Sequence, residues 1–146
     1  DWISSFYARE GEHSALRQGV SAFLKSVVSA FWYLEPDQVS AGEELRRQLA
    51  SEVEALQAEK RYQGRKLMGL DFRSFDRQSE DLAVVTARET WQDALYQFEG
   101  EWPGYGEEPI AQRGPYTLDV TYTLERGDFD RWQVIRALYA DEPPEW

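Results

Sequence analysis

The stretch YTLDVTYTLE, residues Tyr116 to Glu125, decides the fold of this chain. Apolar and polar side chains alternate along it, which is the pattern of a strand with one buried face. After a predicted turn at residues 126–128, WQVIRALY at Trp132 to Tyr139 predicts a returning strand, because β-branched and aromatic residues favour strands. The two stretches therefore predict an antiparallel hairpin. Its buried face is expected to carry Tyr116, Leu118, Val120, Tyr122 and Leu124.

Two further strands are predicted before this hairpin. The alternation between Lys66 and Asp76 indicates one of them, and Leu82 to Phe98 indicates the next, with a polar turn at residues 77–80 between them. In the longer strand, Glu89 shares a face with Trp91, and Arg88 lies on the opposite face. These two strands are expected to pair as a second hairpin.

The first third of the chain has helical periodicity. Apolar residues recur every three or four positions from Ser14, and the helix is expected to end near Leu34, because Pro36 disfavours helical geometry in the residue before it. Ser40 followed by Glu43 predicts a capping box at the start of a second helix, which is expected to stop at Gly64.

Two helices followed by four strands predict an α+β fold, with the N-terminal helices packed on a mainly antiparallel four-stranded sheet. The length of 146 residues favours one domain. We expect residues 1–13 to be a lead-in, residues 14–140 to form the domain, and residues 141–146 to be a proline-interrupted tail.

Composition excludes several classes of function. The formal net charge of −11 repels phosphate backbones and anionic lipids, which argues against a nucleic-acid or membrane-surface role. The sequence has no cysteine, so disulfides and thiolate sites are excluded. Its single histidine, His13, is expected to be a surface residue or to lie at the entry to a helix. The pattern contains no catalytic constellation, metal motif or cofactor motif.

The sequence begins at Asp1 without an initiator methionine, and Trp2 to Tyr7 read as the end of something that continues upstream. We therefore expect a piece of a longer bacterial protein. An extracytoplasmic position beside a membrane anchor is the favoured location.

A loop is predicted from Glu99 to Gly114, where glycines and prolines break the strand pattern. Four glutamates and no basic residue lie between Glu99 and Pro109, and Trp102 and Tyr105 are inserted among them. Long loops are often functional, and Trp and Tyr are frequent anchors of protein interfaces, so this loop is a candidate interaction site.

The segments LMGLDFRSF, LAVVTARETWQDALYQF and TYTLERGDFDRWQVIRAL together resemble the cone-shaped α+β domains of the nuclear-transport-factor-two-like superfamily. The resemblance covers residues 14–139 and is greatest to C-terminal domains of chloroplast division proteins and to extracytoplasmic domains of bacterial membrane proteins. It implies a curved, cystatin-like sheet around a cavity. Two enzyme patterns of the superfamily are missing, because no tyrosine lies early in the first helix and His13 is the only histidine.

Two functions remain open. The first is a non-catalytic binding or protein-interaction module, and the alternative is a small-molecule binder or lyase/isomerase-type enzyme that uses the cavity between helix and sheet. The candidate ligand-binding residues are Arg88, Glu89, Trp91, Tyr122 and Trp132. A homodimer through the outer sheet face, which carries Thr117, Thr121 and Thr123, is a further possibility.

Overall fold

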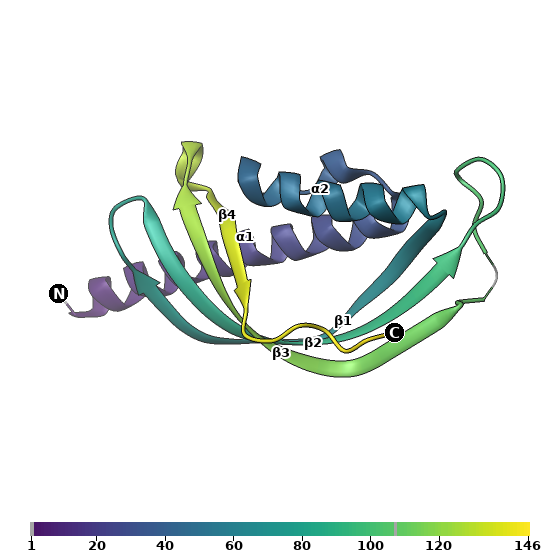
Figure 1. The fold of residues 1–146 in the computed structure, drawn as a ribbon. Helices are drawn as coiled ribbons and strands as arrows, with labels where there is room; N and C mark the ends of the chain where they lie inside the picture. Colours follow the sequence, from purple (N-terminus) through teal and green to yellow (C-terminus); the bar gives the residue numbers. More distant parts are fainter. Residues whose placement is uncertain (1, 107) are drawn as a thin grey trace.

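The computed structural model describes residues 2–106 and 108–146, and for residues 2–9 and 130 it describes the backbone alone. Two α-helices precede a four-stranded sheet, as the sequence predicts, and Figure 1 shows both helices on the concave side of that sheet. The elements are α1 (Trp2–Tyr33), η1 (Pro36–Gln38), α2 (Glu43–Ala58), β1 (Arg61–Arg77), β2 (Leu82–Gln97), β3 (Ala111–Arg126), η2 (Asp128–Asp130) and β4 (Trp132–Tyr139).

The sheet has the order β1-β2-β3-β4, and every strand pairs antiparallel with its neighbour in the sequence. Both predicted hairpins are confirmed, and β4 has the predicted bounds. The alternation in β3 sets its faces, because Leu118, Val120, Tyr122 and Leu124 are buried while Thr117 and Asp119 on the opposite face are not. The α+β prediction is therefore correct.

Helix α1 buries the predicted stripe against the sheet, but it begins at Trp2 and not at Ser14. No proline interrupts residues 2–13. Contacts with β1 hold the early turns: the ring of His13 stacks on Phe75 with centroids 4.4 Å apart, and Glu12 pairs with Arg77 at 3.3 Å. The predicted lead-in is therefore part of the helix.

The predicted capping box is wrong. The N-cap of α2 is Gly42 and makes no side-chain cap hydrogen bond, while the backbone N–H of Ser40 donates to the Ser26 hydroxyl oxygen at 2.8 Å. This contact with α1 determines the conformation at Ser40. Helix α2 also ends earlier than predicted, because Lys60 adopts a φ of 58° that reverses the chain, and Gly64 lies inside β1.

The loop before β3 is shorter than predicted, because β3 already begins at Ala111. Gly114 lies inside this strand with a φ of 96°, opposite an irregularity in β2 between Trp91 and Asp93. A Cβ atom at Gly114 would lie 2.6 Å from the carbonyl oxygen of Trp91, so the backbones approach closely here. In the part of the chain that the structure describes, no helix combines the length and hydropathy needed to span a membrane.

Candidate functional site

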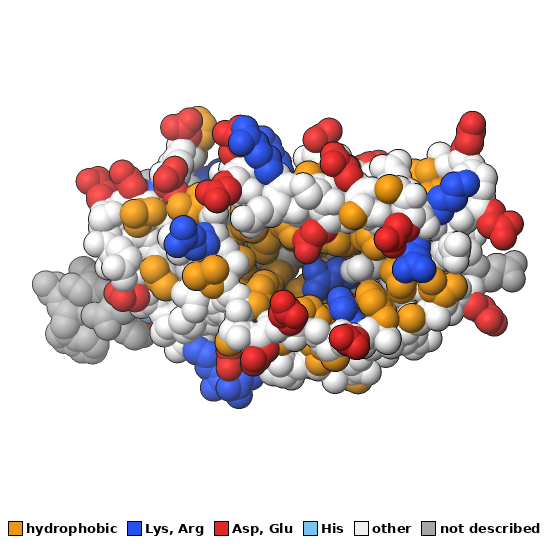
Figure 2. All heavy atoms as spheres, viewed as in Figure 1, with side chains coloured by type: hydrophobic (Ala, Val, Ile, Leu, Met, Phe, Trp, Pro, Cys, Tyr) orange, Lys and Arg blue, Asp and Glu red, His pale blue; other side chains and the backbone are white. Residues whose placement is uncertain are grey.

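A groove of about 700 Å³ opens between the two helices, the end of β4 and the concave face of the sheet. Figure 2 shows the hollow in the middle of the molecule, with hydrophobic side chains on its walls and basic side chains inside it. Its apolar walls include Phe23, Leu24, Val27, Leu45, Leu49, Trp91 and Leu118, and its polar lining includes Gln48, Glu52, Arg65, Tyr139, Asp141 and Glu142. Apolar grooves with a few polar groups are typical ligand sites.

The concave side of β2 places two carboxylates below this groove. Glu89, Trp91 and Asp93 lie on one face because side chains of a strand alternate, and all three are buried. Glu89 accepts hydrogen bonds from Trp91 Nε1 at 2.8 Å, from the Tyr139 hydroxyl at 2.9 Å, and from the Tyr122 hydroxyl. Its acceptor positions are thus occupied by neutral donors from β2, β3 and β4.

Asp93 lies between two arginines in one row across β1, β2 and β3. Its carboxylate accepts from Arg113 Nε at 2.8 Å, pairs with Arg65 Nε at 3.4 Å, and accepts from the Tyr116 hydroxyl. Buried ion pairs need this degree of hydrogen bonding to offset the cost of desolvation. Burial, together with the hydrogen bond to Asp93, raises the pKa of Tyr116.

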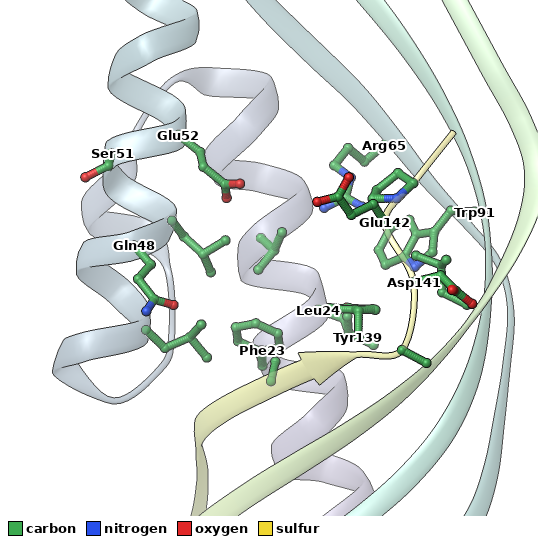
Figure 3. Close-up of a pocket in the computed structure, with 17 residues that line it drawn as sticks. Phe23, Leu24, Gln48, Ser51, Glu52, Arg65, Trp91, Tyr139, Asp141 and Glu142 are labelled. Atoms are coloured by element: carbon green, nitrogen blue, oxygen red, sulfur yellow. The ribbon is translucent and has the colours of Figure 1, made fainter. Parts of the chain in front are cut away.

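Arg65 brings positive charge to the groove. Its side chain is only 16% exposed, and its guanidinium lies 4.3 Å from the centre of the Trp91 ring, within the range of a cation–π contact. Glu52 reaches toward it from α2 (Figure 3). Burial raises the pKa of the Glu52 carboxyl, and the nearby Arg65 charge opposes that rise.

Residues Ala140–Trp146, which we call the strap, follow β4 along the mouth of the groove (Figure 3). Asp141, Glu142 and Pro143 form part of the lining. Arg113 Nη1 donates to the carbonyl oxygen of Pro144 at 3.1 Å, and the Arg113 guanidinium lies 4.1 Å from the centre of the Trp146 ring. The strap therefore forms part of the site.

This geometry supports binding more readily than proton transfer. A general base needs a lone pair aimed at the substrate, whereas the buried carboxylates Glu89 and Asp93 are both engaged by donors from the protein. Burial, reinforced by Tyr139 and Glu89, raises the pKa of Tyr122 far above its usual range and keeps its phenol protonated. Among the residues that the structure describes, no group of three His, Cys, Asp or Glu side chains is placed to hold a metal ion.

The structure brings together three of the five candidate ligand-binding residues. Trp91 lines the groove, and Glu89 and Tyr122 lie in the hydrogen-bonded cluster beneath it. Arg88 lies on the outer face, where its Nε donates to Asp119 at 2.9 Å. Trp132 lies at the start of β4 beneath the guanidinium of Arg77, away from the groove lining.

Sequence reasoning missed several residues of the site, among them Glu52, Arg65, Asp93 and Tyr139. The alternation that places Glu89 and Trp91 on one strand face also places Asp93 there, so the sequence pattern could have predicted this carboxylate. Arg65 fell outside the predicted first strand. Its role depends on the pairing of β1 with β2, which no local pattern reveals.

The predicted interaction loop forms part of an aromatic cluster at the other end of the sheet. Trp102 Nε1 donates to the carbonyl oxygen of Tyr33 at 2.9 Å, and the Tyr105 ring stacks on Trp32 with centroids 5.7 Å apart. The Tyr62 hydroxyl accepts from the backbone N–H of Gly106 at 2.8 Å. Tyr105 remains half exposed. These residues fix the loop to the fold, and their role in interaction stays a prediction.

Comparison with known proteins identifies a structural likeness and no family. No protein-family model matches the sequence, and no curated protein matches it. The crystal structure of the intermembrane space region of the chloroplast protein ARC6 is similar, with a TM-score of 0.67 and 14% identity over 85% of this chain and 92% of that one. The predicted likeness to a plastid domain is therefore confirmed at the level of fold, and the superfamily stays a prediction.

Proposed function

We propose that this chain is a non-catalytic protein-interaction module of a larger protein, and that it binds an extended segment of a partner polypeptide in the groove. The observation that carries the proposal is the groove itself, which combines apolar walls from both helices with the guanidinium of Arg65. Interfaces of this kind use buried aromatic and arginine side chains as their main contacts.

The strap supports a polypeptide as the ligand. Beside the groove, a backbone carbonyl oxygen of the strap is hydrogen-bonded to Arg113, and a tryptophan ring lies against the same guanidinium. A partner segment with carbonyl groups and an aromatic side chain presents the same chemistry. The similarity to the ARC6 region is compatible with an interaction module.

We also propose that the module lies outside the cytoplasm, in a protein held by a membrane anchor. The support is the intermembrane-space origin of the similar ARC6 region. Fractionation of cells that express the full-length protein tests this location, and recovery of the intact protein in the cytosolic fraction would overturn it.

A matched pair of variants on α2 tests the groove. Glu52 lines the groove. Glu54 lies two positions further along the helix, is exposed, and is not part of the groove lining. Peptides selected from a displayed random library are measured by fluorescence anisotropy against the wild type, Glu52→Trp and Glu54→Trp. We expect Glu52→Trp to weaken binding at least tenfold, because the indole fills the mouth, and Glu54→Trp to leave the affinity unchanged. Equal affinities for all three proteins would place the peptide site elsewhere.

A small-molecule binder or lyase/isomerase-type enzyme remains the second candidate, favoured by the groove volume of about 700 Å³. Volumes in this range accommodate drug-sized ligands. A thermal-shift screen with metabolites separates the two proposals. A compound that stabilises the wild type but not Glu52→Trp, together with turnover, would replace the interaction module with this candidate.

A further inference from the structure

We infer that the strap, residues Ala140–Trp146, is a displaceable intramolecular cover that competes with the partner for the groove. The inference rests on the proposed function and concerns the regulation of the same site. Asp141, Glu142 and Pro143 line the cavity that the partner segment is proposed to fill, so strap and partner cannot occupy the mouth of the groove together.

The strap is anchored at its start. The backbone N–H of Ala140 donates to the carbonyl oxygen of Asp119 at 3.0 Å and continues the pairing of β4 with β3. Displacement of the strap therefore pivots about Ala140 and leaves β4 in the sheet. The pivot keeps the displaced segment close to the groove, where its effective concentration remains high.

Beyond the pivot, the strap is lightly held. All of residues 141–146 are at least partly exposed, and Trp146, the largest of them, is 41% exposed. Their described contacts with β3 are one hydrogen bond, from Arg113 Nη1 to the carbonyl oxygen of Pro144 at 3.1 Å, and one cation–π contact, between Arg113 and Trp146 at 4.1 Å. Such contacts contribute little individually, which makes the strap displaceable and not a permanent wall.

Charge favours this position for the strap. Asp141, Glu142 and Glu145 make it acidic, while Arg65 lines the groove and Arg113 lies beside it, in a neighbouring hollow that Arg65 and Pro143 also line. Glu142 and Arg65 are both among the side chains that line the groove (Figure 3). An acidic segment is attracted to this side, whereas a basic strap would be repelled by it. A competing partner segment is therefore expected to be acidic or neutral.

The test compares the full chain with a variant whose strap is loosened, Pro143→Gly/Pro144→Gly/Trp146→Ser. Glycine in place of proline increases the freedom of the detached strap, and serine removes the contact with Arg113. Phe129→Ser is the control, because it removes an aromatic ring that is 92% exposed in η2, outside the groove lining. The probe is a library-selected peptide whose affinity depends on Glu52, measured by fluorescence anisotropy.

We expect the loosened variant to bind the peptide about three- to tenfold more tightly than the wild type, because the cation–π contact with Trp146 no longer has to be broken and the glycines raise the conformational entropy cost of docking the strap. The control is expected to match the wild type. Equal or weaker binding by the loosened variant would overturn the inference that the strap competes for the groove, and it would leave the proposed function intact. A gain of the same size in the control would also overturn it.

A second probe keeps the two proposals distinguishable. If no peptide binds any variant, the interaction module is overturned, and the strap is then judged by the fluorescence of 8-anilinonaphthalene sulfonate, a dye that brightens in apolar grooves. A loosened variant several times brighter than the wild type and the control would support a strap over the groove. Equal brightness in all three proteins would overturn it.

Discussion

Glu89 and Asp93 are buried on the same strand face, yet different groups satisfy them. Asp93 meets two guanidinium groups, whereas Glu89 accepts from the neutral groups of Trp91, Tyr122 and Tyr139. Each donor comes from a defined register position, so a slip of one residue in any strand would separate donors from acceptors. The two carboxylates therefore fix the alignment of the strands beneath the groove.

Substitutions at Glu89 test this contribution. Glu89→Ala removes the acceptor of the buried donors Trp91 and Tyr122 and of the partly exposed Tyr139, and we expect the free energy of unfolding to fall by about 3–5 kcal/mol. Glu89→Gln keeps one carbonyl oxygen and replaces the other with an amide whose N–H the Tyr122 hydroxyl oxygen can accept, so the expected loss is about 1 kcal/mol. Urea unfolding followed by circular dichroism measures both. Equal losses would show that hydrogen bonding is not what Glu89 supplies.

The phenol of Tyr122 predicts sensitivity to alkali. Burial, with Tyr139 and Glu89 nearby, raises its folded pKa, so above about pH 10 the unfolded chain loses a proton that the folded chain retains. The unfolded state then binds fewer protons, and the free energy of unfolding falls with rising pH, by about 1.4 kcal/mol per pH unit for one group.

Unfolding of Tyr122→Phe between pH 10 and 11 is expected to show a slope that is shallower by this amount, although the variant is less stable at neutral pH. Tyr33→Phe, which removes the hydroxyl of a half-exposed tyrosine on α1, is the control for the loss of a phenol. An unchanged slope in Tyr122→Phe would show that this phenol is not protected from ionisation.

At the scale of elements, α1 approaches the hairpin β3–β4 most closely at Gly19. A Cβ atom there would lie 2.7 Å from the carbonyl oxygen of Trp132 and 2.9 Å from Leu124 Cδ2. Gly11 lies in the same helix, and a Cβ atom at that position would have nothing within 4 Å, so the two glycines have different roles. Gly19 permits packing, whereas Gly11 lowers helix propensity without a packing benefit.

Alanine at these two positions is expected to change stability in opposite directions. Gly11→Ala should raise the free energy of unfolding by about 0.5–1 kcal/mol, because alanine is the better helix former. Gly19→Ala should lower it by about 1–3 kcal/mol, because the methyl group forces α1 away from β4. Thermal unfolding of both variants gives the comparison. Stabilisation by both would mean that the contact at Gly19 relaxes without cost.

The elements differ in how far the sequence predicts them. β3 follows from alternation because one of its faces packs on the core, so the local pattern and the tertiary environment agree, and β4 follows from its β-branched and aromatic residues. The start of α2 cannot be predicted from the local sequence, because the backbone N–H of Ser40 donates to the hydroxyl oxygen of Ser26 on another helix. The groove residues also differ in this respect. The strand face of Trp91 could be predicted from alternation, whereas the position of Arg65 depends on the pairing between β1 and β2.

At the scale of the molecule, the groove results from the order of the layers. Both helices lie on the concave side, and the cavity between them, the sheet and β4 is open to solvent. The outer face carries the Arg88–Asp119 pair and a hydrogen bond between Thr90 and Thr117, so its polar groups are partly satisfied within the sheet. A homodimer through that face stays a prediction, and the concave side is the better candidate for a partner.

The packing of α1 on β4 also affects how the chain is synthesised. Roughly 110 residues separate Gly19 from Trp132, so the ribosome makes the first helix long before the last strand that covers it. At about 5–20 residues per second, this interval lasts on the order of 5–20 seconds. During that time the apolar stripe of the nascent helix is incompletely covered and available to chaperones. Helix α1 is made before every strand of the sheet and is among the last elements to be fully enclosed.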